Sequence, residues 1–456
     1  MKYQLPTREI ELNTDYDIIV LGGGPAGCAA AISAAREGKK TLLIESSGML
    51  GGMATKGLVS AWTPYTDGER IIYGGISKEV FLENKNQMEC VPKDRYDWVS
   101  IDYEHLKTVY DRRVRESGAD ILFHTMFCAV EMSDSRNVDK IIVANKSGLT
   151  AYKAKVYIDC TGDADLYAFA GGEYDFGDDE THEVQPATLC FIISGVNEQE
   201  YNKYPWLYGG NEDSVIHKII ADPEFDIPDS HLCCGFVGPN TIGFNAGHIW
   251  NVDNTDPKSV TKAILRGRQL AREYFIALKK YMPKAFENAY LVETAPTIGV
   301  RESRRIIGDY TFTAEDYFAR RSFADEIARN NYFIDIHKSA KENEEMAGHS
   351  DNRYEHYKKG ESHGVPYRIL CPKAFDNMLV AGRTVSSDRI TQGSLRIMPC
   401  CLCEGEAAGM AAAFACESDN INIHNVDTQR LRRRLIEFGA YLPKLDSDTF
   451  CFERGR

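Results

Sequence analysis

Short apolar runs bounded by glycine mark the first part of the chain. Residues 18–21 form one such run, Ile-Ile-Val-Leu, which three consecutive glycines end, and residues 41–44 form another. A short apolar run between turn signals is typical of a buried strand. Small residues, mostly alanine, fill the segment between the two runs, which predicts a closely packed helix that ends near Gly38. The pattern therefore predicts strand, turn, helix and strand in succession.

Helix and strand patterns continue along the next hundred residues. Apolar residues recur with the helical period over residues 106–114, and Gly118 ends that helix. The strands expected after it are residues 121–123, 127–130 and 156–160, with a turn at Lys146–Gly148. We expect a βαβ core that carries an antiparallel insertion.

The middle of the chain has a different pattern, and the first pattern returns near the end. Strand-like runs are expected at residues 188–193, 231–237 and 241–250. An amphipathic helix is expected within residues 260–281. Strands in succession predict a mixed or antiparallel sheet in a separate substrate domain. Residues 378–381 then predict a strand, Gly382 a turn, and residues 398–415 a helix rich in small residues. This predicts a discontinuous cofactor domain, residues 1–165 and 371–456, the latter with a C-terminal helix, around a substrate domain at residues 166–370.

Composition and charge narrow the class of protein. The chain has 456 residues, which is too long for one ordinary domain. Its net charge of −14 is a poor match for a protein that binds the phosphate backbone of a nucleic acid. The arginines of "TQRLRRRLIEFGAYL" follow a helical stripe and are expected on a solvated helix face. No apolar run approaches the roughly 18 residues of a membrane helix, and the polar start predicts a cytoplasmic protein. We expect neither nucleic acid nor membrane as partner.

Thirteen cysteines raise the alternatives of disulfides or a metal cluster. The odd number and the absence of a secretion signal favour reduced thiols. Cys400, Cys401 and Cys403 are close in sequence, but a cluster needs four well-spaced thiolates. We therefore expect small buried residues in a packed helix, and no metal site.

The spacing of the glycines after the first strand indicates a binding site for a dinucleotide. Gly22, Gly24 and Gly27 have G-x-G-x-x-G spacing, which allows a sharp turn, close approach of a pyrophosphate, and tight packing of helix on strand. Glu45, at the end of the second strand, can accept hydrogen bonds from an adenosine ribose and would repel the extra phosphate of NADP. An NAD domain normally completes its site in one block, whereas Gly382 begins a second turn far along the chain. The longer FAD fits this arrangement.

These motifs resemble the FAD-dependent oxidoreductases of glutathione-reductase-type fold, and most closely a bacterial family named simply FAD-dependent oxidoreductases. The matching segments are "GGGPAGCAAA", "GGMAT", "IDCTGDADL", "TIGVRESRRIIGDYTFT", "HGVPYRIL", "NMLVAGRTVSS" and "RIMPCCLCEGEAAGMAAA". The resemblance implies FAD as cofactor. It also implies an α/β fold, in which a discontinuous Rossmann-like FAD-binding domain, a parallel sheet with an antiparallel insertion, is joined to a mixed α+β substrate domain.

The resemblance also implies the residues that contact FAD. The pyrophosphate would lie on Gly22, Gly24, Pro25, Ala26 and Gly27, and the adenosine ribose on Glu45 and Ser46. The other contacts implied are Gly51, Gly52, Met53 and Thr55 at the phosphates and flavin, Ala129 at the adenine edge, Thr161, Gly162 and Asp163 at the nucleotide half, and Gly382 and Arg383 at the ribityl chain. The helix that begins at Met398 would direct its positive end toward the pyrimidine side of the flavin.

The chain departs from the best-known glutathione-reductase members in two ways. Residues 235–243, "GFVGPNTIG", have neither the spacing nor the context of a second dinucleotide fingerprint. No C-x-x-x-x-C pair accompanies the first helix. We therefore expect no built-in NAD(P)H domain and no disulfide reduction, so an electron donor or acceptor of unknown identity must complete the reaction.

Two segments carry candidate catalytic residues. In "VRESRRIIGDY", the guanidinium groups of Arg301 and Arg304 could orient a carboxylate substrate. The alternative is an internal ion-pair cluster with Glu302 and Asp309. In "ESHGVPYRIL", His363 could move a proton and Tyr367 could hydrogen-bond a substrate oxygen, although both could simply be packed side chains. His337 is a weaker candidate.

The sequence thus predicts an enzyme that transfers a hydride between flavin N5 and a small polar or anionic metabolite, as a dehydrogenase or reductase. The alternative is a flavin-binding protein without redox turnover of a metabolite. That class includes RNA-modifying flavoenzymes and hydrolases or lyases on a borrowed FAD fold. The acidic net charge disfavours RNA as substrate.

Overall fold

The computed structural model describes residues 9–339, 341 and 356–443. Its central sheet is parallel, with the strand order β19-β10-β2-β3-β6. These strands are β2 (Ile18–Leu21), β3 (Thr41–Ile44), β6 (Asp120–Leu122), β10 (Val156–Asp159) and β19 (Met378–Val380). The pairing of β19 with β10 confirms that two segments distant in sequence complete one sheet.

The two faces of the central sheet belong to different hydrophobic cores. Ile18 and Val20 of β2 pack in a core with the helices, whereas Ile19 and Leu21 pack in a second core with the antiparallel insertion. Successive side chains of a strand point to opposite faces, so a strand that is covered on both sides is apolar at every position. This explains why the apolar runs in the sequence are continuous rather than alternating.

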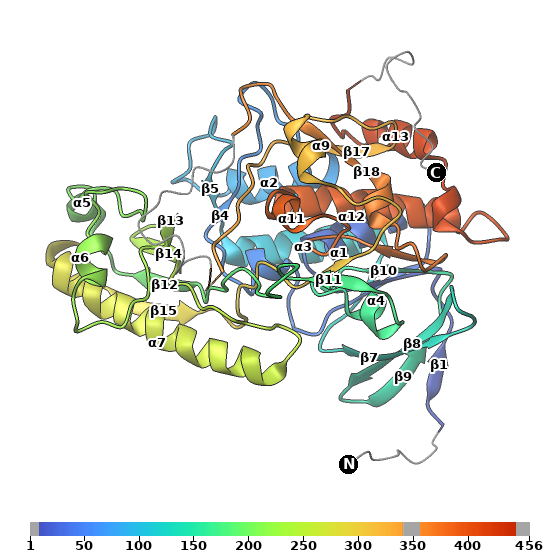
Figure 1. The fold of residues 1–456 in the computed structure, drawn as a ribbon, viewed down its shortest axis with the longest axis horizontal. Coiled ribbons are helices and arrows are strands. Elements are labelled where there is room, and N and C mark those ends of the chain that lie inside the picture. The colour runs from blue at the N-terminus through green and yellow to red at the C-terminus, as the bar shows by residue number, and fades with distance from the viewer. Residues whose placement is uncertain (1–8, 340, 342–355, 444–456) are drawn as a thin grey trace.

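One face of the central sheet carries helices α1 (Pro25–Arg36), α3 (Tyr103–Ser117) and α12 (Met398–Ala415), which lie together in the middle of Figure 1. Helices α1 and α12 pack at very short range. A Cβ atom added to Gly405 or Gly409 would lie 2.0 Å from the carbonyl oxygen of Ala26 or 2.1 Å from that of Ala30, respectively. Small residues therefore hold the first and last parts of the predicted cofactor domain together.

The other face carries the insertion, a sheet of order β1-β9-β8-β7. Its members are β1 (Glu11–Asn13), β7 (Met126–Met132), β8 (Val138–Asn145) and β9 (Gly148–Tyr152). Strands β7, β8 and β9 are antiparallel, as predicted, and β1 is added in parallel to β9.

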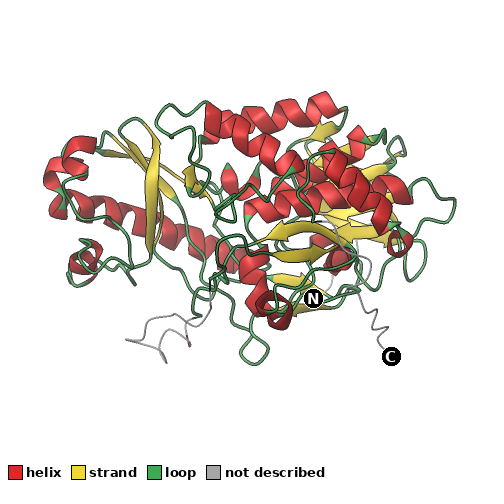
Figure 2. Ribbon diagram, turned by 90° about the horizontal axis from the view of Figure 1, so that it is seen from above, coloured by secondary structure: helices red, strands yellow, loops and turns green. Residues whose placement is uncertain are grey.

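A second module lies at the left of Figure 1 and has its own core. Its sheet has the order β13-β14-β12-β15, with every neighbouring pair antiparallel. The long helix α7 lies beneath this sheet in the figure, and Figure 2 shows the module extending from one end of the molecule. The elements are β12 (Phe191–Ser194), α5 (Glu198–Tyr201), α6 (Ile216–Ile220), β13 (Leu232–Gly238), β14 (Thr241–Ala246), α7 (Pro257–Tyr281), α8 (Pro283–Phe286) and β15 (Tyr290–Thr294).

The cores divide the middle of the chain differently from the predicted boundaries at residues 166 and 370. The core of the second module has members from Phe191 to Ala289, whereas most buried hydrophobic residues from Ala295 to Leu370 belong to the large core around α1 and α12. The elements that return to that core include α9 (Ala314–Phe318), β17 (Glu326–Asn330), β18 (His363–Pro366) and η2 (Tyr367–Leu370), whereas β16 (Arg304–Ile306) adds Ile306 to the core on the insertion side.

The remaining elements connect these parts. They are η1 (Gly52–Ala54), β4 (Ala61–Trp62), α2 (Gly75–Asn86), β5 (Val99–Ser100), α4 (Asp165–Phe169), β11 (Tyr174–Phe176), α11 (Arg389–Leu395), η3 (Ile423–Asn425) and α13 (Thr428–Glu437). No single helix in the described part of the chain is long and apolar enough to cross a membrane. Helices α11 and α12 have sufficient length and apolar composition only when taken together, and a sharp bend separates them.

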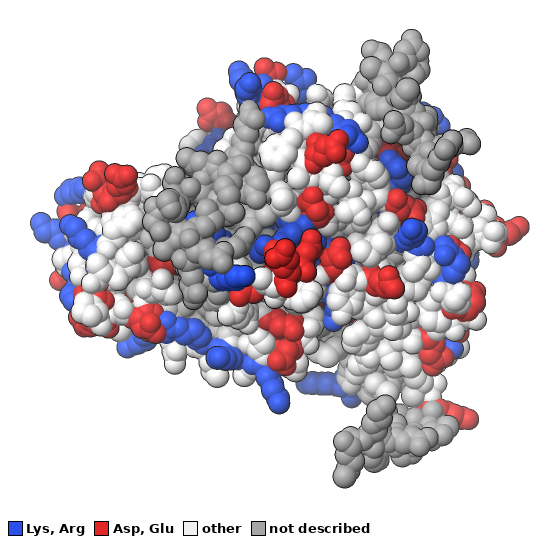
Figure 3. Space-filling view, in the orientation of Figure 1, with Lys and Arg blue, Asp and Glu red and all other residues white. Residues whose placement is uncertain are grey.

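Both signs of charge are spread over the face shown in Figure 3. The arginine-rich segment near the C-terminus forms α13, and three of its four guanidinium groups, those of Arg430, Arg432 and Arg434, have carboxylate partners. Arg430 pairs with Glu417, and Arg434 pairs with Glu37. These arginines are therefore balanced by acidic neighbours and do not form an isolated basic patch.

The short contact between α1 and α12 gives a test by alanine substitution. We expect Gly409→Ala to lower the free energy of unfolding by about 2 kcal/mol, because the added methyl group meets the backbone oxygen of Ala30. Gly238→Ala is the matched control, since an added Cβ there meets no atom within 4 Å and φ is not positive. Denaturant unfolding of both variants measures the difference, and equal stability would contradict the packing argument.

Candidate active site

The first glycine turn joins β2 to α1, and two of its glycines are required by sterics. Gly22 has a φ of 94°, a conformation that favours glycine, and a Cβ there would lie 2.4 Å from the oxygen of Cys160. A Cβ on Gly27 would lie 1.8 Å from the oxygen of Gly22. The tight turn and the close packing of helix on strand therefore follow from the sequence as predicted.

Gly24 has a different environment. It occupies the N-cap position of α1, no side chain caps that helix end, and a Cβ built on Gly24 would meet no atom within 4 Å. The loop that carries Gly52 approaches from the other side, where an added Cβ would lie 3.0 Å from the Cα of Gly24. Uncapped N–H groups and the helix dipole favour an anion. The open space beside Gly24 thus fits the pyrophosphate of a dinucleotide.

Glu45 lies at the end of β3 with its carboxylate turned toward this cradle. Its oxygens accept hydrogen bonds from the backbone N–H of Gly23 at 2.7 Å and from the Ser47 hydroxyl, and Lys56 lies 2.9 Å away. Burial alone would raise the pKa of Glu45, but Lys56 and the Ser47 donors outweigh it and lower the pKa. The carboxylate is held ionised as a fixed acceptor.

The second glycine turn reaches the first one. Gly382 has a φ of 104°, and a Cβ on it would lie 3.4 Å from the Cβ of Ala26. Its N–H donates a hydrogen bond of 2.9 Å to Glu404 of α12. Burial raises the pKa of Glu404 to about 8. The two turns, separated by most of the chain, therefore form one continuous cradle.

Arg383 connects this cradle to the turn after β10. Its guanidinium donates to Asp163 and to the backbone oxygen of Val300, both at 2.9 Å, and its Nε is buried without a hydrogen-bond partner. Gly162 lies directly beneath it, where an added Cβ would be 3.4 Å from the guanidinium. A buried donor without a partner is costly, so this Nε is available to a ligand.

Helix α12 begins at Met398, as predicted, and its first turn favours a nearby negative charge. No side chain caps it, and no acidic residue lies in its first turn. Arg396 stands immediately before the helix and donates to the backbone oxygen of Asp335 at 2.7 Å and to its carboxylate at 3.1 Å. The start of α12 is thereby tied to the segment after β17.

The remaining predicted cofactor contacts lie around these turns. Pro25 opens α1, and Ser46 follows Glu45 with its hydroxyl 3.3 Å from that carboxylate. Gly51, Met53 and Thr55 belong to the loop and short helix η1 that pack against α1, while Thr161 follows β10 and Ala129 lies in β7. Their contacts with FAD stay predictions.

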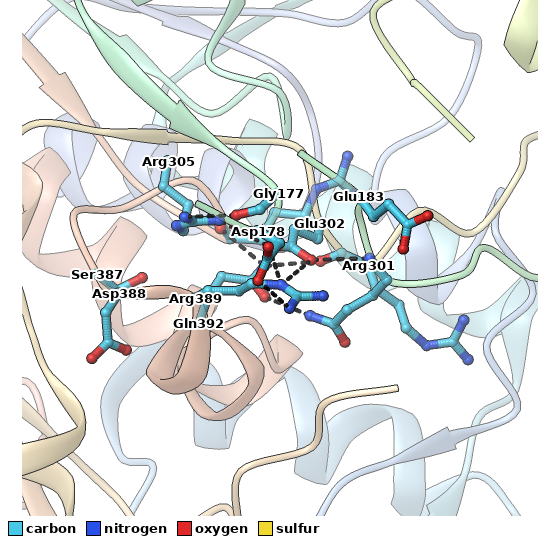
Figure 4. A network of polar contacts seen from close by, with 12 residues as sticks. Gly177, Asp178, Glu183, Arg301, Glu302, Arg305, Ser387, Asp388, Arg389 and Gln392 are labelled. Atoms are coloured by element: carbon cyan, nitrogen blue, oxygen red, sulfur yellow. Dashed lines mark hydrogen bonds and ion pairs between the residues drawn. The ribbon is translucent and has the colours of Figure 1, made fainter. Parts of the chain in front are cut away.

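The arginines of the "VRESRR" segment have separate environments. Figure 4 shows Glu302 at the centre of a buried network, where it pairs with Arg305 at 2.8 Å and with Arg389. Arg304 pairs with Asp165 at 2.9 Å and donates to the oxygen of Asp163. Both arginines therefore have internal partners, which agrees with the ion-pair alternative for this segment, although Asp309 pairs with His424 instead.

Arg301 is the exception in this segment. Its side chain is buried, and it donates to the oxygen of Pro186 at 2.6 Å and to the Thr188 hydroxyl at 3.1 Å. Within the described residues, no carboxylate lies within salt-bridge distance of it. Burial first, and then the nearby Arg396, lower the pKa of Arg301 to about 10, so it remains charged at neutral pH.

A cavity of about 470 Å³ opens next to Arg301, between the second module and the segment after β17. Arg301 lies 3.3 Å from the ring of His231, which forms part of the cavity wall. The residues around the cavity are Tyr208, Gly209, Gly210, Asp229, Ser230, His231, Leu232, His248, Trp250, Ile336, His337 and Lys338. The wall is polar and aromatic, as expected for a site that takes a small polar molecule.

His363 and Tyr367, predicted as catalytic residues, lie elsewhere. His363 is completely buried in β18, next to the Tyr357 hydroxyl, and Tyr367 is buried with its hydroxyl bonded to the oxygen of Ile423. Neither residue lines the cavity, so the structure does not bring them together with Arg301. Both positions match the alternative of packed side chains.

The cavity instead contains histidines that the sequence analysis did not select. His231 precedes β13 and His248 follows β14, and the antiparallel pairing of these strands brings the two rings together. The expected strands at residues 231–237 and 241–250 contained part of this signal, because a short turn between two antiparallel strands brings their outer ends side by side. His337, the weaker candidate of the sequence, completes the group.

Comparisons with known proteins identify the family. A family model described as FAD dependent oxidoreductase matches residues 17–435. A digeranylgeranylglycerophospholipid reductase of Picrophilus torridus is 26% identical over 170 residues, which are 33% of this chain and 40% of that protein. A glutathione reductase of Schizosaccharomyces pombe is 27% identical over 199 residues, 40% of this chain and 39% of that one. The matches thus span less than half the length of these curated relatives.

A solved structure with a similar course of the chain is a geranylgeranyl bacteriochlorophyll reductase-like protein of Thermoplasma acidophilum. It has 14% sequence identity and a TM-score of 0.43, over 93% of this chain and 83% of that one. The family model confirms the resemblance that the sequence motifs indicated, and with it FAD as the cofactor.

The open space beside Gly24 gives a test of the cofactor cradle. We expect Gly24→Ala to leave the unfolding midpoint of the FAD-free protein unchanged, because the added methyl group meets no protein atom. The same methyl group would occupy the pyrophosphate space and weaken FAD binding about tenfold or more. Titration with FAD, followed by the change in flavin fluorescence, measures this. Unchanged affinity would place the pyrophosphate elsewhere, and Gly238→Ala serves as control.

Proposed function

The chain belongs to the family of FAD-dependent oxidoreductases, and on this premise we propose that it transfers a hydride between FAD and a small polar or anionic metabolite. The observation that carries the proposal is the polar cavity beside Arg301, whose wall is connected to the first turn of α12 through Arg396 and Asp335. Family membership favours redox chemistry over the alternative of a flavin-binding protein without turnover.

The residues that hold the cofactor follow from the geometry of the cradle. The N-terminus of α1 with Gly24 receives the pyrophosphate, and Glu45 accepts the ribose hydroxyls. Arg383 and the turn at Gly382 take the ribityl region, and the N-terminus of α12 faces the pyrimidine end. FAD, when bound, supplies a centre that accepts or donates a hydride.

The charges around the cavity determine which substrates it favours. Arg301, Arg396 and Lys338 are positive, whereas Asp229 and Asp335 are the facing carboxylates. Arg301 is desolvated and has no carboxylate partner among the described residues, and a buried charge of this kind favours an anion nearby. We therefore propose a substrate with a carboxylate or several polar oxygens, small enough for the cavity.

Anaerobic reduction of the bound flavin tests the proposed function. The FAD-loaded protein is mixed with panels of hydroxy acids, sugar acids and polyols, and the reduced protein with the corresponding carbonyl compounds. We expect at least one compound to bleach or restore the flavin absorbance near about 450 nm. If no compound changes the flavin in either direction, the proposed metabolite chemistry is wrong.

Substitution of Arg301 tests the substrate anchor separately. We expect Arg301→Met to retain FAD but to raise the substrate concentration for half-maximal reduction at least about tenfold, since a hydrogen bond to a charged group contributes roughly 1.5–3 kcal/mol. Arg433→Met, an exposed arginine of α13, is the control and should behave as the unaltered protein. An equal loss in both variants, or loss of bound FAD in Arg301→Met, would contradict the assignment.

A further inference from the structure

Two imidazoles in the cavity wall lie in a row between two carboxylates. Nδ1 of His248 bonds to Asp229, and Nε2 of His248 lies 2.9 Å from Nδ1 of His337. On the far side, Nε2 of His337 is 3.4 Å from the carboxylate of Asp335. We call these four residues, Asp229, His248, His337 and Asp335, the histidine relay.

The number of protons in the relay decides how many of its links can form. The row has three links between neighbouring polar groups, but two neutral imidazoles supply only two N–H donors. If His248 donates to Asp229 and His337 donates to His248, Nε2 of His337 carries a lone pair that faces the Asp335 carboxylate. The link without a donor is then the last one, which is also the longest at 3.4 Å. One further proton on this nitrogen completes the row.

The histidines are neutral at neutral pH, so this further proton is absent there. Burial lowers the pKa of His248 and of His337, and the charge of Arg301 lowers both further. Burial would raise the pKa of Asp335, but the charges of Arg396 and Arg301 lower it, so the opposing carboxylate is kept ionised; a proton on His337 would lower this pKa further. The relay is therefore a base with one vacant proton position in the cavity wall.

The charged and titratable groups that face the relay come from every element around the cavity. They are Tyr208, Arg301, Arg396, His231, Cys233, Tyr332 and Lys338. Tyr332 donates to Asp335 at 3.1 Å, and Arg396 holds the same carboxylate. Arg396, which bonds to this carboxylate, lies shortly before α12, so the Asp335 end of the relay is connected to the helix whose N-terminus is proposed to face the flavin.

The same histidines could be considered as metal ligands, since ring nitrogens of His231, His248 and His337 lie within 4.8 Å of one another. However, the rings of His231 and His248 are stacked, with centroids 4.1 Å apart and planes inclined by only 6°. An imidazole lone pair lies in the plane of its ring, so lone pairs in parallel planes do not converge on one ion. The arrangement favours proton transfer over metal binding.

We propose that the histidine relay is the general base of the site and that Nε2 of His337 accepts the hydroxyl proton when an alcohol in the cavity is oxidised. This inference rests on the proposed function. The C–H bond of the carbinol carbon breaks with transfer of its hydride to oxidised FAD, the O–H bond breaks with transfer of its proton to His337, and a C=O bond forms. The favoured substrate class is therefore a secondary alcohol that carries a carboxylate.

A nuclear magnetic resonance titration of FAD-loaded protein labelled with ¹⁵N-histidine tests the shared proton without any substrate. We expect the ring nitrogens of His248 and His337 to titrate with one common midpoint below the ordinary histidine value of about 6.5. Asp335→Asn should lower this midpoint by about one pH unit, since it removes the carboxylate that stabilises the added proton. His337→Gln should abolish the common transition, and His217→Gln, outside the cavity, should not change it.

Three results would overturn the relay. Independent titration of the two histidines, or a His248 midpoint that His337→Gln leaves unchanged, excludes a shared proton. One equivalent of zinc or iron per chain in the purified protein, with spectra that change on its removal by a chelator, assigns the histidines to a metal instead. Because these measurements need no turnover, they remain decisive if the proposed redox function is wrong.

The pH profile of flavin reduction by an active alcohol tests the catalytic part. We expect the rate to rise with pH through the midpoint of the relay and then to level off, since the base form accepts the proton. His337→Gln should lower the rate about 100-fold on the plateau and remove the rising limb. A loss of equal size at every pH, with the limb preserved, would show a structural role and leave the oxidoreductase function standing.

Discussion

The close contact between α1 and α12 is the constraint on which the rest of the structure depends. Gly405 and Gly409 let the backbone of α12 reach the carbonyl oxygens of Ala26 and Ala30, so two helices from opposite ends of the chain share one surface. That contact fixes where α12 begins, and its uncapped first turn is thereby set beside the turns at Gly22 and Gly382. A pair of larger residues here would separate the halves of the cofactor cradle.

The second module adds a cavity wall to the cradle that this helix contact positions. The cradle supplies the uncapped helix ends and Arg383, whereas the cavity wall is shared by the second module, with His231 and His248, and the segment after β17, with His337. Arg396 and Gln392 are the physical connection between the two, since both bond to segments that border the cavity and lie in or just after α11. The proposed positions of the cofactor and of the substrate therefore depend on one short stretch before α12.

The sequence predicted the sheet and the cradle well, because their signals are local. Continuous apolar runs marked β2, β3, β10 and β19, and helix α12 has the predicted bounds, residues 398–415. The catalytic candidates stay predictions, because no comparable local signal identifies them. His363 and Tyr367 are four residues apart, but a strand and a turn bury both, so spacing alone carried no information. Asp229, His248 and Asp335 come from three separate segments and meet only through strand pairing and packing, which no local pattern encodes.

The place of β19 and α12 in the chain also governs how the protein is made. Until the ribosome has synthesised residues 378–415, the edge of β10 and the small-residue face of α1 have no partner within the nascent polypeptide. Such an unpaired edge is prone to association with other chains. A cradle that needs Gly382 and the start of α12 is accordingly completed late in biogenesis, and a chain truncated before residue 378 lacks both of these parts.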